Sequence, residues 1–304
     1  MLQVTILGSS AALPMYGRHL ACQVLESGRQ AIMIDCGEGT QYQCQRFSVS
    51  FHHLHMVLIS HLHGDHFFGL IGLLNSMHMM GRKQGLHICA PPDLADVIRL
   101  QLKVSQSVLG YELWFNALPT DSTAIFYEDD LLSISTIPLM HRIKPCNGFL
   151  IREKLKQPNI KPNSLPADTP KETYITLKQG RDVVDEAGKM LYKFEDYTYI
   201  PPSYAYAYCS DTIYDERIVP IVEGVDLLYH EATFLHEDLE KAIQTCHTTA
   251  KQAAQIALQA NVKHLIIGHI SARYANSEPL LEEAQAVFPH TSFGTEGKTF
   301  KAVE

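Results

Sequence analysis

The chain has 304 residues, a formal net charge of -8 and a pI of about 6.0, so it lacks the overall positive field of a histone-like nucleic-acid binder. With 46% hydrophobic and 19% charged residues it can bury a large core, and no apolar run approaches the ~18 residues of a membrane span. Seven scattered cysteines without a CxxC pair indicate reduced thiols, and the first residues resemble a strand rather than a signal peptide. We therefore expect a cytoplasmic protein with no membrane segment.

The amino-terminal part of the sequence is expected to be rich in strands. Strands are predicted at 2–7, 21–25, 31–34, 56–60 and 86–90, the second and third joined as a hairpin. Helices are predicted at 41–47, 67–74 and 92–109. The polar stretches 35–40 and 60–66 directly follow two of these strands and are therefore candidates for a functional site.

The carboxyl-terminal part has a similar organisation. Strands are predicted at 130–137, 204–209, 225–229 and 262–267, and an alanine-rich helix at 248–260. Polar residues follow each strand, and the carboxyl ends of strands are where α/β proteins assemble their active sites. Two strand-rich halves followed by helices predict an α/β fold with two sheets packed face to face and helices outside.

Residues 151–203 differ from the rest of the chain in composition. The stretch is rich in lysine and proline and also contains acidic residues, so its basic excess is modest. Two interpretations are open: a poorly structured surface loop with solvated charges, or a basic, proline-punctuated excursion with a function of its own.

The stretch Ser-His-Leu-His-Gly-Asp-His at 60–66 is the strongest chemical signal in the sequence. In extended chain leaving a strand, residues two apart point the same way, so His61 and His63 can bind one ion. A bend at Gly64 turns Asp65 and His66 toward a second ion. Imidazole and carboxylate are ligands that suit zinc. The alternative is a polar surface loop that happens to be rich in histidine.

Further histidines and an aspartate follow other strands and complete a set of seven candidate metal ligands. The set is His61, His63, Asp65, His66, His141, Asp211 and His269. If Asp211 bridges, one zinc takes His61, His63 and His141, and the other takes Asp65, His66 and His269. Two such ions would support in-line displacement at phosphorus, with Asp65 placed to accept the proton of the attacking water.

Several longer motifs resemble those of one family. The 60–66 stretch is similar to the signature of the metallo-β-lactamase superfamily. Four further motifs resemble those of the ribonuclease Z family. They are Asp-Cys-Gly-Glu-Gly-Thr-Gln at 35–41, His-Glu-Ala-Thr at 230–233, His-Thr-Thr-Ala at 247–250 and Gly-His-Ile-Ser-Ala-Arg-Tyr at 268–274. Members of this family cut the 3′ trailer from precursor tRNA.

The resemblance implies a fold, an activity and partners. It implies one metallo-β-lactamase-like domain over 1–304, a four-layer αβ/βα sandwich, with residues 151–203 as an inserted, protruding arm that grips tRNA. It implies a homodimer with two zinc ions per subunit, precursor tRNA as substrate and no organic cofactor. Asp65 is the implied proton acceptor, and Glu231 with His247 would orient or protonate the leaving 3′ oxygen.

The resemblance also suggests supporting residues. Asp35 is expected to hydrogen-bond a metal ligand rather than bind metal itself. Arg18, Lys178 and Arg273 are candidate RNA contacts, although Arg273 could instead form a salt bridge with a sheet acid. Glu231 could likewise be only a helix-capping acid. The turn at 14–19 departs from the usual family pattern, with Tyr16 and His19 in place of lysine and asparagine.

Two other functions remain to be weighed. The same centre could hydrolyse small or cyclic phosphodiesters, which would need no arm. The chain could also be a catalytically silent RNA-binding subunit, which predicts that metal ligands have been lost. None of the seven is missing.

Overall fold

The computed structural model describes residues 2–302, which form two compact units. The larger unit comprises residues 2–127, 134–151 and 204–302, and the smaller comprises residues 128–133 and 152–203. Two seven-stranded sheets lie at the centre of the larger unit.

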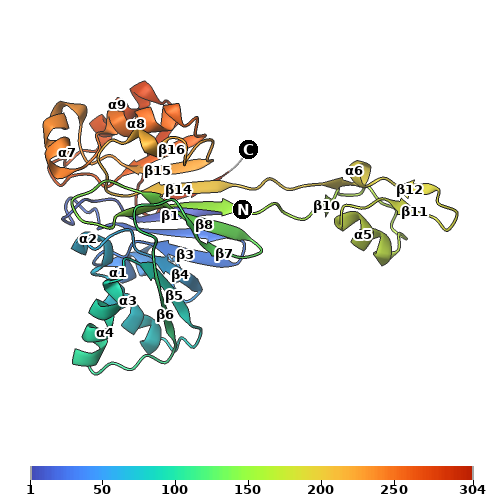
Figure 1. The fold of residues 1–304 in the computed structure, drawn as a ribbon, viewed down its shortest axis with the longest axis horizontal. Helices are drawn as coiled ribbons and strands as arrows, with labels where there is room; N and C mark the ends of the chain where they lie inside the picture. The colour runs from blue at the N-terminus through green and yellow to red at the C-terminus, as the bar shows by residue number, and fades with distance from the viewer. Residues whose placement is uncertain (1, 303–304) are drawn as a thin grey trace. The chain divides into compact units, whose positions relative to one another are not determined.

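The first sheet has the strand order β18-β1-β2-β3-β4-β5-β6. Its strands are β1 Leu2–Gly8, β2 Cys22–Ser27, β3 Gln30–Ile34, β4 Leu54–Leu58, β5 Leu86–Ala90, β6 Leu113–Ala117 and β18 Thr299–Lys301. Strands β3 to β6 run parallel. Its helices are α1 Thr40–Arg46, α2 Gly64–Phe67, α3 Leu70–Met79 and α4 Leu94–Val104. They pack an apolar core against one face of this sheet (Figure 1).

The second sheet has the strand order β17-β16-β15-β14-β9-β8-β7. Its strands are β7 Ile125–Glu128, β8 Leu132–Pro138, β9 Asn147–Glu153, β14 Ala205–Cys209, β15 Leu227–Glu231, β16 His264–Gly268 and β17 Thr291–Phe293. Its helices are α7 Leu239–Thr245, α8 Ala250–Gln259 and α9 Glu278–Val287, with 3-10 turns η1 Glu216–Ile218 and η2 His236–Asp238. The helix α8 begins with a capping box between Thr249 and Gln252 and buries a row of alanines, which permits close packing on the sheet.

Aromatic side chains fill the space between the two sheets. Tyr208 stacks on Phe149 and on Tyr229, at ring-centroid distances of 6.4 and 5.1 Å. The hydroxyl of Tyr206 hydrogen-bonds Gln23 in the other sheet. Tyr206, Tyr208 and Tyr229 are all fully or nearly fully buried. With helices outside both sheets, the four layers confirm the predicted αβ/βα sandwich (Figure 1).

Two of the predicted helices have the wrong bounds. The helix predicted at 67–74 is broken between α2 and α3, where the Gly69 N–H donates to the Cys36 carbonyl instead of continuing a helix. The helix predicted at 92–109 is only α4 (Leu94–Val104), because Gln106 adopts a left-handed conformation with φ of 53° and ends it. Strands β6, β7, β9, β17 and β18 were not predicted, nor were the short strands of the smaller unit.

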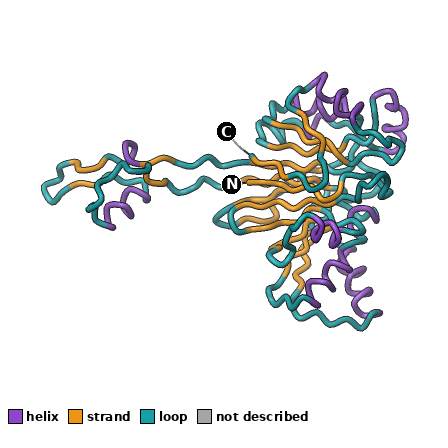
Figure 2. Tube along the Cα trace, turned by 180° about the vertical axis from the view of Figure 1, so that it is seen from behind, coloured by secondary structure: helices purple, strands orange, loops and turns teal. Residues whose placement is uncertain are grey.

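The smaller unit has secondary structure of its own (Figure 2). It contains the strand pairs β10 Asn159–Ile160 with β13 Thr198–Tyr199 and β11 Val183–Val184 with β12 Met190–Tyr192, and the helices α5 Lys171–Lys178 and α6 Phe194–Tyr197. Leu177 of α5 is fully buried. The interpretation of this stretch as a poorly structured loop is therefore wrong.

All seven cysteines are free thiols, and six of them are buried. Burial raises the pKa of Cys146 well above its usual range, so this thiol stays protonated. Across residues 2–302, every helix is too short or too polar to traverse a lipid bilayer.

Candidate metal centre and catalytic site

The seven predicted ligands come from four loops that begin at the carboxyl ends of strands, and the structure brings all seven together. His61 and His63 follow β4, and Asp65 and His66 lie on the short helix α2. The others follow separate strands of the second sheet: His141 after β8, Asp211 after β14 and His269 after β16. Both sheets therefore contribute to one centre.

One group of ligand atoms surrounds an oxygen of Asp211. His63 Nδ1 lies 3.1 Å from His61 Nε2 and 3.1 Å from His141 Nε2. Each of those two Nε2 atoms lies 3.6 Å from Asp211 Oδ2. Burial lowers the pKa of His61 and of His141, so both imidazoles are neutral and offer a lone pair.

A second group surrounds the other oxygen of the same carboxylate. Asp211 Oδ1 lies 3.4 Å from His66 Nε2 and 3.2 Å from His269 Nε2. Both Nε2 atoms lie 3.6 Å from Asp65 Oδ2. Burial disfavours the Asp65 carboxylate, but His66 and His269 together more than compensate and keep the pKa of Asp65 well below its usual range. Asp211 thus presents one oxygen to each group.

The spacing of these atoms fits metal ions. A tetrahedral ion with bonds of about 2.1 Å separates its ligand atoms by about 3.4 Å, and the separations here are 3.1 to 3.6 Å. His66 Nε2, His269 Nε2 and Asp211 Oδ1 are buried and have no hydrogen-bond partner among residues 2–302. Buried polar atoms without partners are rare, and a cation would satisfy all three.

Four of the imidazoles are oriented by hydrogen bonds at the opposite ring nitrogen. The Nδ1 atoms and their partners are His61 with Ser60 Oγ at 3.0 Å, His66 with Asp35 Oδ2 at 2.7 Å, His141 with the Cys246 carbonyl at 2.9 Å and His269 with Thr233 Oγ1 at 3.0 Å. Because Nδ1 is engaged, each ring turns Nε2 toward the centre of the cluster.

Asp35 lies behind His66 and not within either group of ligand atoms. Its carboxylate accepts hydrogen bonds from the Ser60 N–H (2.8 Å) and hydroxyl (2.9 Å) and from the Tyr208 hydroxyl (2.7 Å). It is fully buried and has a positive φ of 56°, a conformation that non-glycine residues adopt at a cost. These contacts are those expected of a residue that supports a ligand.

Glu231, at the end of β15, is the hub of a second network beside the metal ligands. Its fully buried carboxylate accepts hydrogen bonds from His247 Nδ1 (2.9 Å), from Thr233 (N–H 2.9 Å, hydroxyl 2.7 Å), and from the Thr212 (3.2 Å) and Thr248 (3.0 Å) N–H groups. Burial opposes the His247 imidazolium, but Glu231 outweighs it and raises the pKa of His247 to about 9. His247 therefore carries a proton at neutral pH.

Glu231 does not cap a helix, since the N-cap of α8 is Thr249. His247 also lies close enough to Asp211 and His269 to form a third group of possible ligands. Its Nδ1 is held by the buried Glu231 carboxylate, as the Nδ1 of His66 is held by Asp35.

Two residues of the site were not singled out from the sequence. Tyr208 reaches Asp35 from the opposite sheet, and Thr233 links Glu231 to His269 through its hydroxyl. Thr233 belongs to the His-Glu-Ala-Thr motif, which could have indicated it. Nothing in the alternating strand pattern around Tyr208 identifies its partner.

The three RNA-binding candidates lie in different surroundings. Arg18 donates to the Tyr274 carbonyl at 2.6 Å and lies over the Tyr16 ring. Arg273 forms an ion pair of 2.7 Å with Asp238, an acid of η2 and not of a sheet. Lys178 is exposed at the end of α5 in the smaller unit and has no ion pair within the described part of the chain.

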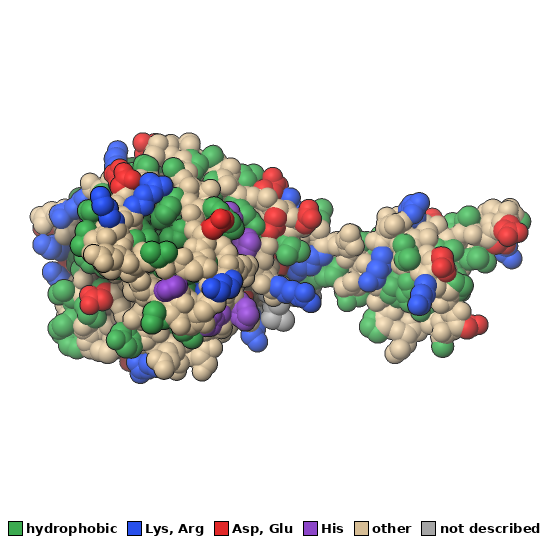
Figure 3. Space-filling view, turned by 90° about the horizontal axis from the view of Figure 1, so that it is seen from below, with side chains coloured by type: hydrophobic (Ala, Val, Ile, Leu, Met, Phe, Trp, Pro, Cys, Tyr) green, Lys and Arg blue, Asp and Glu red, His purple; other side chains and the backbone are tan. Residues whose placement is uncertain are grey.

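Five of the seven predicted ligands line a cavity of about 570 Å³ in the larger unit: His63, Asp65, His141, Asp211 and His269. It is also lined by His247, by Glu38 and Arg142, and by the apolar side chains of Leu13, Pro14 and Phe68. On the face drawn in Figure 3, histidine side chains reach the surface of this unit. The lining residues His63 and Asp65 are partly exposed, so the cavity can admit a ligand to the centre.

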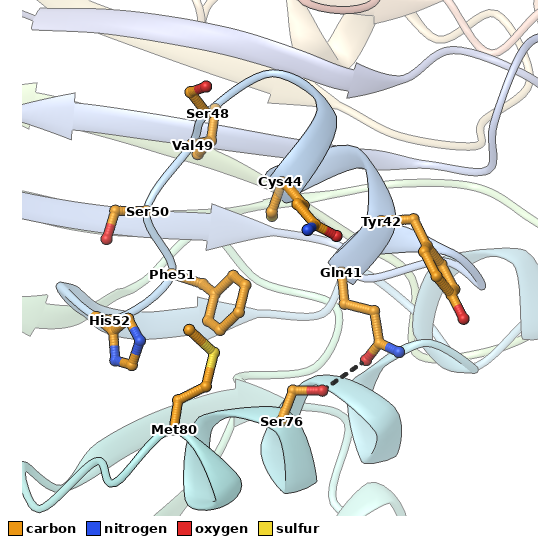
Figure 4. Close-up of a pocket in the computed structure, with 11 residues that line it drawn as sticks. Gln41, Tyr42, Cys44, Ser48, Val49, Ser50, Phe51, His52, Ser76 and Met80 are labelled. Carbon is orange, nitrogen blue, oxygen red and sulfur yellow. Dashed lines mark hydrogen bonds between the residues drawn. The ribbon is translucent and has the colours of Figure 1, made fainter.

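A second cavity of about 490 Å³ lies between α1, the following loop and α3 (Figure 4). Gln41 and Ser76 hydrogen-bond at 3.1 Å at one side of it, and Phe51 and Met80 provide apolar surface. None of the predicted site residues lines it.

Known proteins resemble this chain over nearly its whole length. Ribonuclease Z of Cytophaga hutchinsonii is 46% identical over 300 residues, covering 98% of this chain and 95% of the relative. Human tRNase Z, short form, matches with a TM-score of 0.73 and 23% identity, covering 99% of this chain and 100% of that structure. The metallo-β-lactamase fold protein YhfI from Bacillus subtilis gives a TM-score of 0.69 and 18% identity, at 99% and 100% coverage.

A family model also matches the amino-terminal half. Residues 2–156 fit the family described as Anti-Pycsar protein Apyc1. This match includes the 60–66 stretch and His141 but ends before Asp211, Glu231 and His269, whereas the relative from Cytophaga hutchinsonii covers all of them. With 46% identity over nearly the full length and the fold of a metallo-β-lactamase, the chain belongs to the ribonuclease Z family.

Proposed function

We propose that this protein is a divalent-metal-dependent endonuclease that removes the 3′ trailer from precursor tRNA and leaves a tRNA 3′-hydroxyl. One observation carries the proposal: His247, which is paired with the buried Glu231, lines the same cavity as five of the predicted metal ligands. The chain that carries this site belongs to the ribonuclease Z family.

The cluster would hold two zinc ions per subunit. His61, His63 and His141 would hold one, Asp65, His66 and His269 the other, and Asp211 would bridge them, since its two oxygens face the two groups. When bound, two such ions supply activation of a water molecule and stabilisation of negative charge at phosphorus.

The protein's own side chains would carry the protons. Asp65 Oδ2 accepts a hydrogen bond of 2.9 Å from the Ala12 N–H, which fixes the carboxylate beside the cavity. From there Asp65 can take the proton of the attacking water. His247, kept protonated by Glu231, would donate its proton to the leaving 3′ oxygen.

The smaller unit would be the arm that binds tRNA, as proposed for residues 151–203. Lysine and arginine side chains lie beside hydrophobic ones on its surface (Figure 3). Exposed cations of this kind neutralise phosphates. Lys178 is our candidate for such a contact in this unit, and Arg18 and Arg273 are our candidates in the larger unit.

We further propose that the protein is a homodimer, as the family resemblance implies. We also propose that it acts in the cytoplasm, which the seven free thiols favour. Size-exclusion chromatography with light scattering should give twice the mass of one chain. A monomer at micromolar concentration would exclude the dimer.

The principal test is cleavage of a precursor tRNA that carries a defined 3′ trailer. We expect one cut just after the discriminator base, lost on treatment with a chelator, restored by zinc and absent in Asp65→Ala. A purified, metal-loaded protein that leaves the precursor intact would overturn the proposal.

A second candidate is hydrolysis of small or cyclic phosphodiesters, since a cavity of about 570 Å³ has the size of a small-ligand site. Competition separates the two functions. If the protein hydrolyses a small phosphodiester efficiently and an excess of precursor tRNA does not inhibit that hydrolysis, the small substrate is the physiological one.

A further inference from the structure

The side chain of Phe68 is unusually placed for a large apolar residue. It is 62% exposed, although its neighbour Phe67 is only 8% exposed. It lines the same cavity as the metal ligands His63, Asp65 and His269. Leaving an aromatic ring in water beside a polar centre gives up the gain from burying it.

The Phe68 ring is nevertheless held in place by contacts with Phe67 and Gly64. It makes an edge-to-face contact with Phe67, at a centroid distance of 4.9 Å and an interplanar angle of 70°. It also lies directly over Gly64, where an added Cβ would come within 2.3 Å of the ring. Any side chain at position 64 would displace the Phe68 ring, so the glycine at this position allows the ring to lie where it does.

Other exposed apolar side chains line the same cavity. Leu13 is 56% exposed, and both Leu13 and Pro14 line the cavity with Phe68. The mouth of the site therefore combines an ionic centre, suited to a phosphate, with apolar surface, suited to the flat face of a base. A nucleotide carries both groups on one unit.

We propose that Phe68 is a substrate-positioning residue whose ring stacks on an unpaired nucleobase flanking the scissile phosphate. This inference rests on the proposed function, because it requires a nucleic-acid substrate. Stacking on an aromatic ring tolerates every base, which suits an enzyme that processes tRNAs of different sequence. A ring already fixed by Phe67 and Gly64 loses little entropy on binding.

The base could lie on either side of the cut, as the last nucleotide of the tRNA product or the first of the trailer. The test therefore uses three precursors: one intact, one abasic at the last product nucleotide and one abasic at the first trailer nucleotide. The value of kcat/KM is measured for the unmodified enzyme, Phe68→Ala and Phe68→Tyr on each.

On the intact precursor we expect Phe68→Ala to lower kcat/KM by about 10-fold or more, and Phe68→Tyr to retain activity because its ring also stacks. On one of the abasic precursors, Phe68→Ala should cause no further loss. The abasic position that removes the effect identifies the stacked base. Leu100→Ala, which truncates a side chain that is 61% exposed on α4, is the matched control and should change nothing.

Three results would overturn the inference. Phe68→Ala could act equally on the intact and both abasic precursors, it could have no effect, or its loss could follow a loss of bound metal or of the dimer. Metal content, thermal melting and mass of each variant are measured for this reason. If the unmodified enzyme cleaves no precursor, the proposed function fails as well, so the two failures are distinguishable.

Discussion

At the scale of single residues, the centre depends on Asp211, whose two oxygens face two separate groups of ligand atoms. The sequence indicated the seven candidate ligands that the structure brings together, because spacing within 60–66 and polar residues at strand ends are both local signals. It could not predict the partner of Asp35. Tyr208 lies 173 residues away and reaches Asp35 across the space between the sheets, a contact that exists only once the sheets pack.

Asp35→Asn should weaken metal binding. The Asp35 carboxylate only accepts hydrogen bonds, and an amide would replace one of its oxygens by an N–H₂ donor. The hydrogen bond that orients the His66 ring would then be lost. We expect metal affinity to fall by about 10- to 100-fold, measured by competition with a chromogenic chelator. Tyr208→Phe removes a single donor and should have a smaller effect. Unchanged affinity in Asp35→Asn would show that this carboxylate does not support the centre.

Glu231→Gln should impair chemistry rather than substrate binding. Without the carboxylate, His247 loses the charge that keeps it protonated. Single-turnover cleavage at saturating enzyme should slow by about 100-fold or more, with precursor affinity unchanged. The control is Glu237→Gln, an exposed acid of η2. Equal single-turnover rates for the two variants would contradict the role of Glu231.

At the scale of elements, the sequence predicted where most strands and helices lie, because apolar periodicity is a local property. The strands β6 and β7 were missed, since as edge strands they are largely half-exposed or exposed and show little of the apolar pattern of a central strand. The break between α2 and α3 was missed because its cause is a tertiary contact, the close approach of Gly69 to the backbone of Gly37.

Gly69→Ala, just before α3, should destabilise the protein, whereas Gly72→Ala within α3 should not. A Cβ at Gly69 would come within 2.0 Å of the Gly37 carbonyl oxygen, a backbone atom that cannot give way. At Gly72 the nearest atom is 3.2 Å away and belongs to the flexible Gln41 side chain.

We expect Gly69→Ala to cost about 1–3 kcal/mol or more, while Gly72→Ala gains up to about 1 kcal/mol from helix propensity. Urea denaturation measures both. Equal stability of the two variants would mean that Gly69 does not mark a tight contact.

At the scale of the whole molecule, the chain consists of a sandwich that carries the centre and a smaller unit of short strands and helices. Composition alone set residues 151–203 apart, but it could not decide between a loop and a folded unit. That decision depends on side chains such as Leu177, which is buried only in the folded unit.

Lys178→Gln should weaken tRNA binding without affecting the chemistry at the centre. If this cation contacts one phosphate, the slope of log affinity against log salt should decrease by about 1. Binding is measured by fluorescence anisotropy with a labelled precursor. Lys103→Gln on α4 removes an equal charge from the larger unit and serves as control. Identical slopes for the two variants would argue against a phosphate contact at Lys178.

Anomalous scattering from zinc-loaded crystals shows whether the seven side chains hold two metal ions. We expect two peaks in each chain, one among His61, His63 and His141 and the other among Asp65, His66 and His269, with Asp211 between them. A single peak, or none after full loading, would contradict this expectation.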